Sequence, residues 1–321
     1  MNFQEFKAFR DQVTEQRSLL RLDCMNPFKA MSFLKVGFEN ARRHSCDDAL
    51  DLWAETMGVE EYRSAAIASG GVRASLKGLF NIFAAHGKEL WLPEDVYPFY
   101  WDSAQNEGLS SRSFPTLPIP DFTVLNQASA ESVVVITSPV SPLGRTLNDE
   151  ETSQIKHWLS ESKGRRVFLD TVYSYTRGFD KNTMDLFETG QCFVSHSLSK
   201  AWLERGVFGA LLAPEGDQHV CRNVLVSPSN MACSSAFTAL GQSNLPDKQQ
   251  HAFSQEWSRL ASDIREFVPS FQIPKTGYFA AINAKHDEVL KKYNALVIPA
   301  TVFGSSRQDV SIISCLYDIS S

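Results

Sequence analysis

A run of five β-branched residues, Val133-Val134-Val135-Ile136-Thr137, constrains the fold of this chain most. A strand that is apolar on both faces needs a cover on both sides, which is typical of parallel sheets between two layers of helices. Further strands are predicted at residues 90–93, 166–170, 192–196 and 209–213. Because amphipathic helical segments alternate with these strands, the sequence predicts an α/β domain with a mostly parallel sheet.

The pattern changes after Pro214. Apolar side chains recur at helical spacing over residues 248–267, and three short strands surround one further helix. These strands are predicted at residues 278–282, 296–299 and 310–313. We expect a smaller α+β C-terminal domain, completed by the N-terminal segment. The predicted division is an N-terminal segment at 1–60 that packs with the small domain, a large domain at 61–215 and the small domain at 216–321.

The charge balance excludes some classes of partner. The chain has 37 acidic and 31 basic side chains among 321 residues, and its net charge is −6. Because both signs are mixed along the chain, no basic stripe is available for nucleic acid. No apolar run approaches the roughly 20 residues that span a bilayer, and the first residues lack the apolar core of a signal peptide. We expect a cytoplasmic protein that binds neither nucleic acid nor a membrane.

Six cysteines are scattered along the chain, and none forms a C-x-x-C pair, which argues against a zinc or iron–sulfur site. They are Cys24, Cys46, Cys192, Cys221, Cys233 and Cys315. Six cysteines could form three disulfides, but a large chain with no export signal favours reduced, buried thiols. We therefore expect no metal and no disulfide framework.

Four polar segments stand at predicted strand ends or helix starts, where ligands bind in open α/β sheets. The first is Ser69-Gly70-Gly71-Val72-Arg73, before a helix whose free amides could hold an anion. The second, T-S-P-V-S-P-L-G-R at residues 137–145, follows the β-branched strand. Each has a plain alternative: the first could be a structural turn and the second a rigid connection.

The third segment places Asp170 at the end of an apolar strand and Tyr173 three residues later. A buried carboxylate is costly unless it meets a cation or hydrogen-bond donors. A protonated pyridine nitrogen would be such a cation, and Tyr173 could reach the phenolic oxygen of the same ring. Alternatively, Asp170 caps the following turn.

The fourth segment, Ser197-Leu198-Ser199-Lys200, follows another apolar strand. A lysine in such a place can be desolvated, which lowers its pKa and makes the amine a better nucleophile. Ser197 and Ser199 could bind a phosphate group. The alternative is a surface lysine in a serine-rich loop.

In this order the four segments resemble those of fold-type I enzymes that depend on pyridoxal 5′-phosphate (PLP), in the class I/II aminotransferase branch. That family has a Gly-centred phosphate turn, an N-P-x-N-P-x-G turn, a D-x-x-Y strand end and an S-x-S-K segment. The counterparts here are S-G-G-V-R, S-P-V-S-P-L-G-R, D-T-V-Y and S-L-S-K-A-W. The resemblance covers about residues 65–215 well and the C-terminal part more loosely. It implies a PLP-binding large domain, a small-molecule amino acid or amine substrate, and a homodimer.

The resemblance also implies a role for each matching residue. Lys200 would hold PLP as a Schiff base (an internal aldimine) and later move the substrate proton. Asp170 would keep the pyridine nitrogen protonated, and Tyr173 would hydrogen-bond the ring oxygen. The other expected cofactor-binding residues are Gly71, Val72, Arg73, Ser197 and Ser199 at the phosphate, Tyr97 stacked on the ring, Ser141 near the ring oxygen, and Arg205.

Three positions depart from the family's pattern. Ser141 replaces the second asparagine of the proline-rich turn. Phe208 stands eight residues after the lysine, where the family has a phosphate-binding arginine, so Arg205 is the expected substitute. The C-terminal arginine that clamps a substrate α-carboxylate falls on Ser311, and Arg307 lies on the preceding turn. Carboxylate recognition is therefore either moved or absent.

Three functions stay open at this point. The first is an aminotransferase that acts on an amino acid or amine in specialised metabolism. The second is a PLP enzyme of elimination, replacement, cyclisation or decarboxylation, since the motifs do not report which substrate bond is broken. The third is a non-catalytic protein that kept the fold for binding or regulation. The presence of Lys200, Asp170 and Tyr173 together argues against the third.

Overall fold

The β-branched run forms β5 (Ser132–Thr137), which is buried along its whole length. In this computed structural model, which describes residues 1–16, 18–31, 43–242 and 244–316, β5 lies inside a seven-stranded sheet of order β2-β8-β7-β6-β5-β3-β4. The other strands are β2 (Ala66–Ser69), β3 (Glu89–Pro93), β4 (Ser111–Phe114), β6 (Arg166–Asp170), β7 (Cys192–Ser197) and β8 (Gly209–Leu212). Only β8 runs against its neighbours, which confirms the predicted, mostly parallel sheet.

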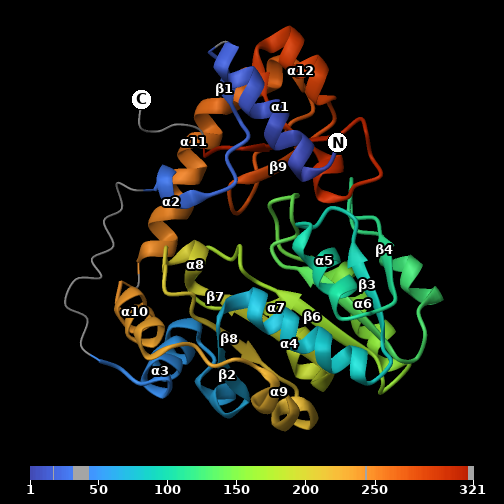
Figure 1. Ribbon diagram of the computed structural model, residues 1–321, viewed down its shortest axis with the longest axis vertical. Coiled ribbons are helices and arrows are strands. Elements are labelled where there is room, and N and C mark those ends of the chain that lie inside the picture. Colours follow the sequence, from blue (N-terminus) through green and yellow to red (C-terminus); the bar gives the residue numbers. More distant parts are fainter. Residues whose placement is uncertain (17, 32–42, 243, 317–321) are drawn as a thin grey trace.

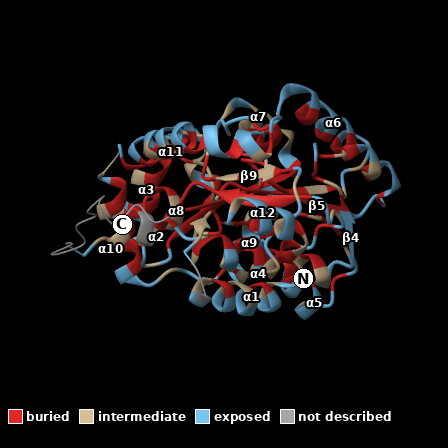
Figure 2. Ribbon diagram, turned by 90° about the horizontal axis from the view of Figure 1, so that it is seen from above, coloured by how far each residue is buried: buried red, intermediate tan, exposed pale blue. Residues whose placement is uncertain are grey.

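Helices cover both faces of this sheet. One face carries α4 (Gly71–Ala85), α5 (Phe99–Asn106) and α9 (Gln218–Val224), and the other carries α6 (Asp149–Ser160) and α7 (Lys181–Leu186) (Figure 1). Figure 2 shows the buried residues as a middle layer between these helices. Successive β5 side chains point to opposite faces of the sheet. Val133 and Val135 lie in the apolar core beside α4, whereas Val134 and Ile136 lie in the core beside α6. This explains why the strand has no polar face.

The C-terminal part forms a second, smaller sheet of order β11-β12-β9, in which both pairs are antiparallel. Its strands are β9 (Phe279–Ile282), β11 (Ile298–Pro299) and β12 (Ser311–Ser314), and its helices are α11 (Leu245–Phe267) and α12 (His286–Tyr293). This confirms the predicted smaller domain.

The start of the chain packs on this small domain, as Figure 1 shows. Strand β1 (Leu20–Arg21) pairs in parallel with β10 (Ala295–Leu296). Phe6 of α1 (Phe3–Gln16) is buried in the same apolar cluster as the β12 residue Ile312. The N-terminal helix is therefore a structural part of the small domain.

Other elements join the large sheet from outside its predicted limits. Helix α3 (Cys46–Met57) packs against β2 and against α10 (Asn230–Leu240), and α9 packs against α4. The division at residues 60 and 215 stays a prediction. The remaining elements are the short helices α2 (Pro27–Ala30) and α8 (Leu198–Ala201), 3-10 turns at Glu60–Ala65, Phe122–Gln127, Glu215–Asp217 and Ala300–Phe303, and a π turn at Phe187–Gln191.

One expectation about the cysteines is wrong. Cys46 and Cys233 form a disulfide, because the packing of α3 on α10 brings their Cα atoms to 5.1 Å although 187 residues separate them. Sequence spacing carried no sign of this pair. The other four cysteines are free thiols, three of them buried, as expected.

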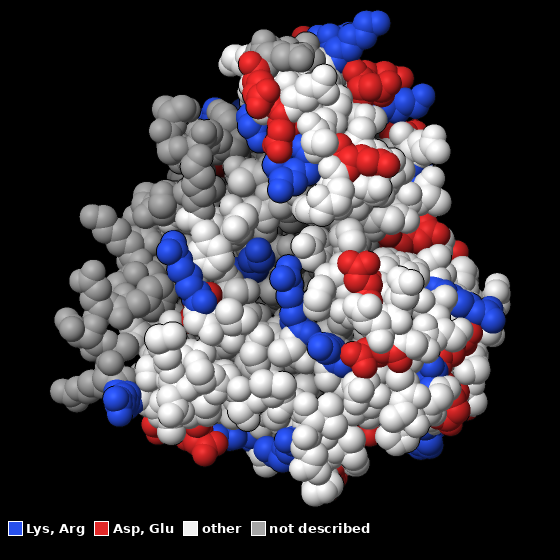
Figure 3. All heavy atoms as spheres, viewed as in Figure 1, with Lys and Arg blue, Asp and Glu red and all other residues white. Residues whose placement is uncertain are grey.

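The described residues contain no group of three or more His, Cys, Asp or Glu side chains that could hold a metal ion. None of the helices described is long and apolar enough to cross a membrane. On the face seen in Figure 3, Lys and Arg side chains form separate spots, several of them around the middle of the face, rather than one continuous basic area over the part of the chain described there.

Candidate active site

One large cavity, of about 480 Å³, lies where the carboxyl ends of β3, β5, β6 and β7 meet the small domain. Because these four strands are parallel, the polar segments that follow them reach the same edge of the sheet. Ten of the eleven predicted site residues line this cavity. They are Gly71, Val72, Arg73, Tyr97, Ser141, Asp170, Tyr173, Ser197, Ser199 and Lys200.

The glycine turn and the lysine segment meet through β8. Gly209 of β8 pairs with Ser69 on one side and with Ser197 on the other, so the starts of α4 and α8 lie side by side. Gly71 has a φ of +79°, and a Cβ there would lie 3.3 Å from Ser197 Oγ and 3.4 Å from Val207 Cγ1. The backbone conformation therefore favours glycine here, and a Cβ would also press on the side chains of Ser197 and Val207.

The start of α4 suits an anion. Its N-cap residue, Gly70, offers no side chain to the first backbone amides, which are free donors at the positive end of the helix. Arg73, in the first turn, lines the cavity and has no ion-pair partner among the described residues. Its guanidinium carbon lies 5.5 Å from the Tyr97 ring centre and 5.1 Å from that of Phe99. A phosphate group fits these donors and this uncompensated charge.

Lys200 lies in the first helical turn after β7, at the inner wall of the cavity. Burial, with a smaller effect from the charge of Arg73, lowers the pKa of its amine to about 8. An amine with this pKa is about half uncharged near pH 8, whereas an ordinary lysine is almost wholly charged there. Lys200 is therefore a usable nucleophile for a carbonyl carbon.

Asp170, at the end of β6, is 2% exposed and has no Lys or Arg partner among the described residues. One carboxylate oxygen accepts from the Val172 amide at 2.8 Å, and the other accepts from the Tyr100 hydroxyl. Burial raises the pKa of Asp170 to about 6 despite both hydrogen bonds. A protonated pyridine nitrogen would give this buried carboxylate the positively charged hydrogen-bond donor that it lacks.

Tyr173 and Ser141 line the same cavity as Asp170. Burial raises the pKa of Tyr173 to about 12, so its phenol stays protonated and can donate a hydrogen bond. The ring packs edge-on against Tyr278, with 5.7 Å between the ring centres. The Ser141 amide donates to Thr137 Oγ1 at 3.0 Å, which holds the proline-rich turn against the end of β5.

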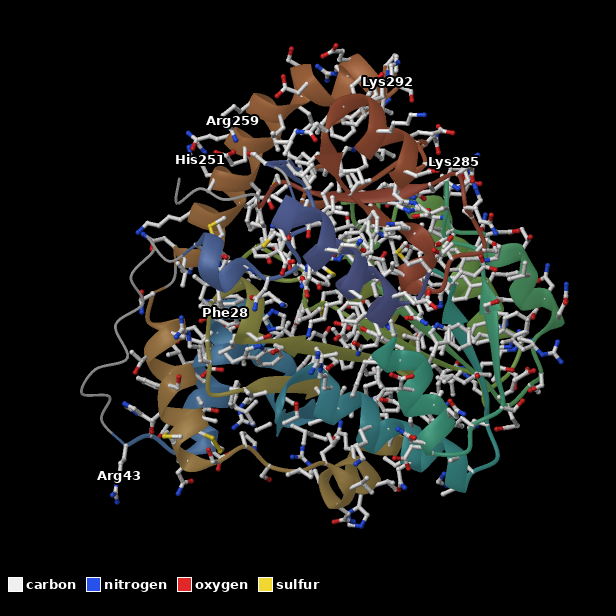
Figure 4. The ribbon with its side chains drawn as sticks, turned by 45° about the horizontal axis from the view of Figure 1, so that its top comes forward. Phe28, Arg43, His251, Arg259, Lys285 and Lys292 are labelled. Atoms are coloured by element: carbon white, nitrogen blue, oxygen red, sulfur yellow. A yellow bond between two sulfur atoms is a disulfide. The ribbon has the colours of Figure 1, made fainter. Side chains whose placement is uncertain are left out.

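The N-terminal segment closes part of the cavity. Phe3 packs edge-on against Tyr97, with 6.2 Å between the ring centres, and Met25, Asn26 and Phe28 also line the cavity. Figure 4 shows Phe28 at the level where the small domain meets the large one. The cavity is therefore built from both domains.

Arg205, the expected substitute for the phosphate arginine, does not reach the cavity, and neither does Phe208, which stands at that arginine's position. Phe208 is fully buried, and its neighbour Val207, with a φ of +64°, lines the cavity instead. Arg205 is exposed, does not line the cavity, and lies over the Phe28 ring at 5.4 Å from its centre. Among the described residues, Arg73 is the arginine that reaches this cavity.

Ser311, the expected position of the carboxylate clamp, does not line the cavity. It is buried, and its hydroxyl donates to the Ala284 carbonyl at 2.7 Å. The next residue of β12, Ile312, points to the opposite face and does line the cavity. Arg307 is held by Asp309 through two hydrogen bonds, of 2.8 and 2.7 Å, and stays outside.

The cavity also brings together residues that were not predicted as site residues. Tyr100 and Asp95 come from the segment after β3, and Thr137 is the last residue of β5. Tyr100 is three residues beyond the predicted stacking residue Tyr97, a helical spacing that could have placed both in one site. Asp95 comes two residues after the buried strand β3, a position close to the one that drew attention to Asp170.

Comparison with known proteins agrees with this geometry. The family described as "Aminotransferase class I and II" matches residues 42–311. A histidinol-phosphate aminotransferase from Halorubrum lacusprofundi is 26% identical over 208 residues, which are 62% of this chain and 54% of that protein. The match thus spans about half of that relative's length.

Solved structures are similar over almost the whole chain. An aspartate aminotransferase double mutant from Thermus thermophilus has a TM-score of 0.77 at 15% identity, covering 99% of this chain and 92% of the other. An aminotransferase from Mycobacterium tuberculosis has a TM-score of 0.76 at 16% identity, covering 98% and 92%. At these identities the likeness shows a shared fold. Since the family match extends over most of the sequence, the chain belongs to the class I and II aminotransferases.

Proposed function

We propose that this protein is a PLP-dependent aminotransferase that acts on an amino acid or amine of specialised metabolism. The observation that carries the proposal is the meeting, in one cavity, of a lysine with a lowered pKa, a buried carboxylate without a cation, and a helix start with free amides. When bound, PLP draws electrons away from the carbon that carries the substrate's amino group, so that this carbon can lose a proton.

The residues of this chain divide the work. Lys200 would hold the cofactor through its amine and, once released, move a proton at the substrate carbon. Asp170 would hold a proton at the ring nitrogen, since a charged pair in this desolvated place is stronger than in water. Tyr173 would donate to the ring oxygen. The α4 amides, Arg73 and Ser197 would hold the phosphate and fix the cofactor in place.

The cavity also limits the substrate. The basic side chains among its described lining residues are Lys200 and Arg73, and both are engaged by the cofactor in this proposal. With Ile312 of β12 facing the cavity, no further arginine of the described lining can clamp a carboxylate. This favours a specialised substrate over the common dicarboxylic amino acids. A cytoplasmic location and a homodimer with shared active sites remain part of the proposal.

Reconstitution tests the proposal. Purified protein with PLP is expected to show a visible absorption band that Lys200→Ala lacks, whereas Lys77→Ala, at an exposed position on α4, keeps it. A panel of amines with 2-oxo acids should then give amino-group transfer. A wild type without any band, or a band that survives in Lys200→Ala, would overturn the assignment. Release of ammonia or carbon dioxide without transfer would show another PLP reaction.

A further inference from the structure

Asp95 is a buried carboxylate in the cavity that the proposed cofactor does not use. It is 3% exposed, lines the cavity, and follows β3 (Glu89–Pro93) by two residues. Its Oδ2 accepts from the Thr116 hydroxyl at 2.6 Å, whereas its Oδ1 accepts no hydrogen bond of good geometry from the described residues; the buried Ser305 hydroxyl lies close enough to lower the pKa of the carboxyl but does not complete such a bond. An acceptor buried in this state is costly unless a ligand supplies a donor.

Asp95 has no ion-pair partner among the described residues, although the charge of Arg307 acts on it from a distance. Arg307 is the basic side chain whose charge reaches it, and the guanidinium of Arg307 forms two hydrogen bonds with Asp309. Glu94, next to Asp95 in the chain, adds a negative charge rather than removing one. Burial raises the pKa of Asp95, and the neighbouring hydroxyls of Ser305 and Thr116 only partly oppose this. When ionised, this carboxylate would therefore be stabilised by a positively charged ligand group.

The position of Asp95 separates it from the reacting centre. In the sheet order β7-β6-β5-β3, three strand spacings lie between the strand that leads to Lys200 and the strand that leads to Asp95. At about 4.8 Å per spacing, the two strand ends are roughly 14 Å apart. The side chains of Lys200 and Asp95, which both line the cavity, shorten the distance that a ligand must span. Asp95 also lies near the small domain, since a Cβ on Gly304 would be 3.0 Å from the carbonyl oxygen of the adjacent Glu94. A substrate held at Lys200 would meet Asp95 with its far end.

From this arrangement we infer that the substrate is a primary amine carrying a second, positively charged nitrogen, which donates to Asp95 Oδ1 while the first amine reacts at Lys200. The wall of the cavity near Asp95 includes Phe303, Tyr97 and Val96, which suits an aliphatic spacer. The inference rests on the proposed function for the reacting end and adds the recognition of the other end.

Three matched five-carbon amines test it: 1,5-diaminopentane, n-pentylamine and 5-aminopentanoate, which end in an ammonium, a methyl and a carboxylate group. Dissociation constants are measured by the change in visible absorption of the PLP-loaded protein. The wild type is expected to bind the diamine about tenfold to hundredfold more tightly than the monoamine, and the carboxylate most weakly. A diamine that binds no more tightly than the monoamine overturns the inference, and this measurement needs no variant.

Asp95→Asn locates the effect. It is expected to remove the preference for the diamine and to leave the affinity for n-pentylamine within about twofold, since the reacting end is unchanged. Glu94→Gln, which removes the neighbouring charge outside the cavity, should keep the preference. If Asp95→Asn lowers the affinity for both amines equally, the role of Asp95 is merely structural and the inference is overturned.

Calorimetry on the cofactor-free protein separates this inference from the proposed function. If PLP gives no visible band in the wild type, the proposed function fails, but the diamine can still be tested as a ligand of Asp95. It should then bind to the wild type and to Glu94→Gln, and about tenfold more weakly to Asp95→Asn. Equal binding to all three proteins, or binding to none, overturns the role of Asp95.

Discussion

Replacing Asp170 by Asn should stabilise the cofactor-free protein. The same change should remove the activity of the protein that has PLP bound. The carboxylate is 2% exposed, and its pKa is raised from 3.8 to about 6 by burial. This difference corresponds to about 3 kcal/mol that the folded state loses when the group ionises. Asn keeps both neighbours, because its oxygen can accept from the Val172 amide and its amide group can face the Tyr100 hydroxyl.

The sign of the effect depends on pH. Below pH 3.8 the carboxyl is protonated in both the folded and the unfolded chain, so it causes no difference in stability. Between pH 3.8 and about 6 the unfolded chain loses its proton first, and the free energy of unfolding of the wild type falls as pH rises. Above about pH 6 the free energy of unfolding of the wild type is reduced by the full amount. The variant should therefore be more stable by up to about 3 kcal/mol at pH 8 and by little at pH 4.

Urea unfolding of the two proteins at pH 4 and pH 8, followed by tryptophan fluorescence, measures this difference. Asp263→Asn, at an exposed position of α11, serves as the control and should change stability little at either pH. Addition of PLP should reverse the order, because the cofactor would stabilise the wild type more than the variant. A variant that is less stable than the wild type at pH 8 without PLP would show that the carboxylate is held by favourable contacts, and would refute the reasoning.

Three further expectations follow from the same cavity. Gly71→Ala should weaken PLP binding by about tenfold or more, since the new methyl group strains a positive φ and approaches Ser197. Gly216→Ala, where a Cβ meets nothing within 4 Å, should leave the PLP affinity unchanged in a fluorescence titration. Aspartate with 2-oxoglutarate, which would give oxaloacetate and glutamate, should react with a kcat/KM below about 10⁴ M⁻¹s⁻¹; a normal value that falls in Arg307→Ala would show that this arginine leaves Asp309 to bind the substrate. Light scattering at assay concentration should give the mass of a dimer, and a fully active monomer would contradict the expected sharing of active sites.

The sequence was sufficient for the five inner strands of the large sheet and for several residues at their ends, whereas the two edge strands, β2 and β4, were not predicted. A β-branched strand with no polar face, such as β5, can bury both of its faces in a sheet that is covered on both sides. Asp170 and Lys200 were found because a polar residue at the end of a buried strand is costly without a partner. The same reasoning applied to Asp95 would have found it too.

Other features depended on packing that no local pattern reports. Ser311 and Ile312 are neighbours in β12, yet their side chains lie on opposite faces of the strand, because strand side chains alternate. A shift of one residue therefore decides which of them lines the cavity. The disulfide between Cys46 and Cys233 depends on how α3 lies on α10. The Tyr100 hydroxyl bonds a carboxylate 70 residues further along the chain, at the end of β6. Tertiary arrangement decides each of these.

The place of β12 in the small sheet has a consequence for the order of folding during synthesis. All seven strands of the large sheet lie between residues 66 and 212, so this sheet can assemble while the ribosome is still adding the rest of the chain. The small sheet cannot, because its central strand, β12, is also the last of the described strands to be made. Strand β1, which precedes all strands of the large sheet in the chain, must wait for β10 before it can pair. If the large sheet folds first, its cavity would lack the wall that carries Ile312 until β12 has been made.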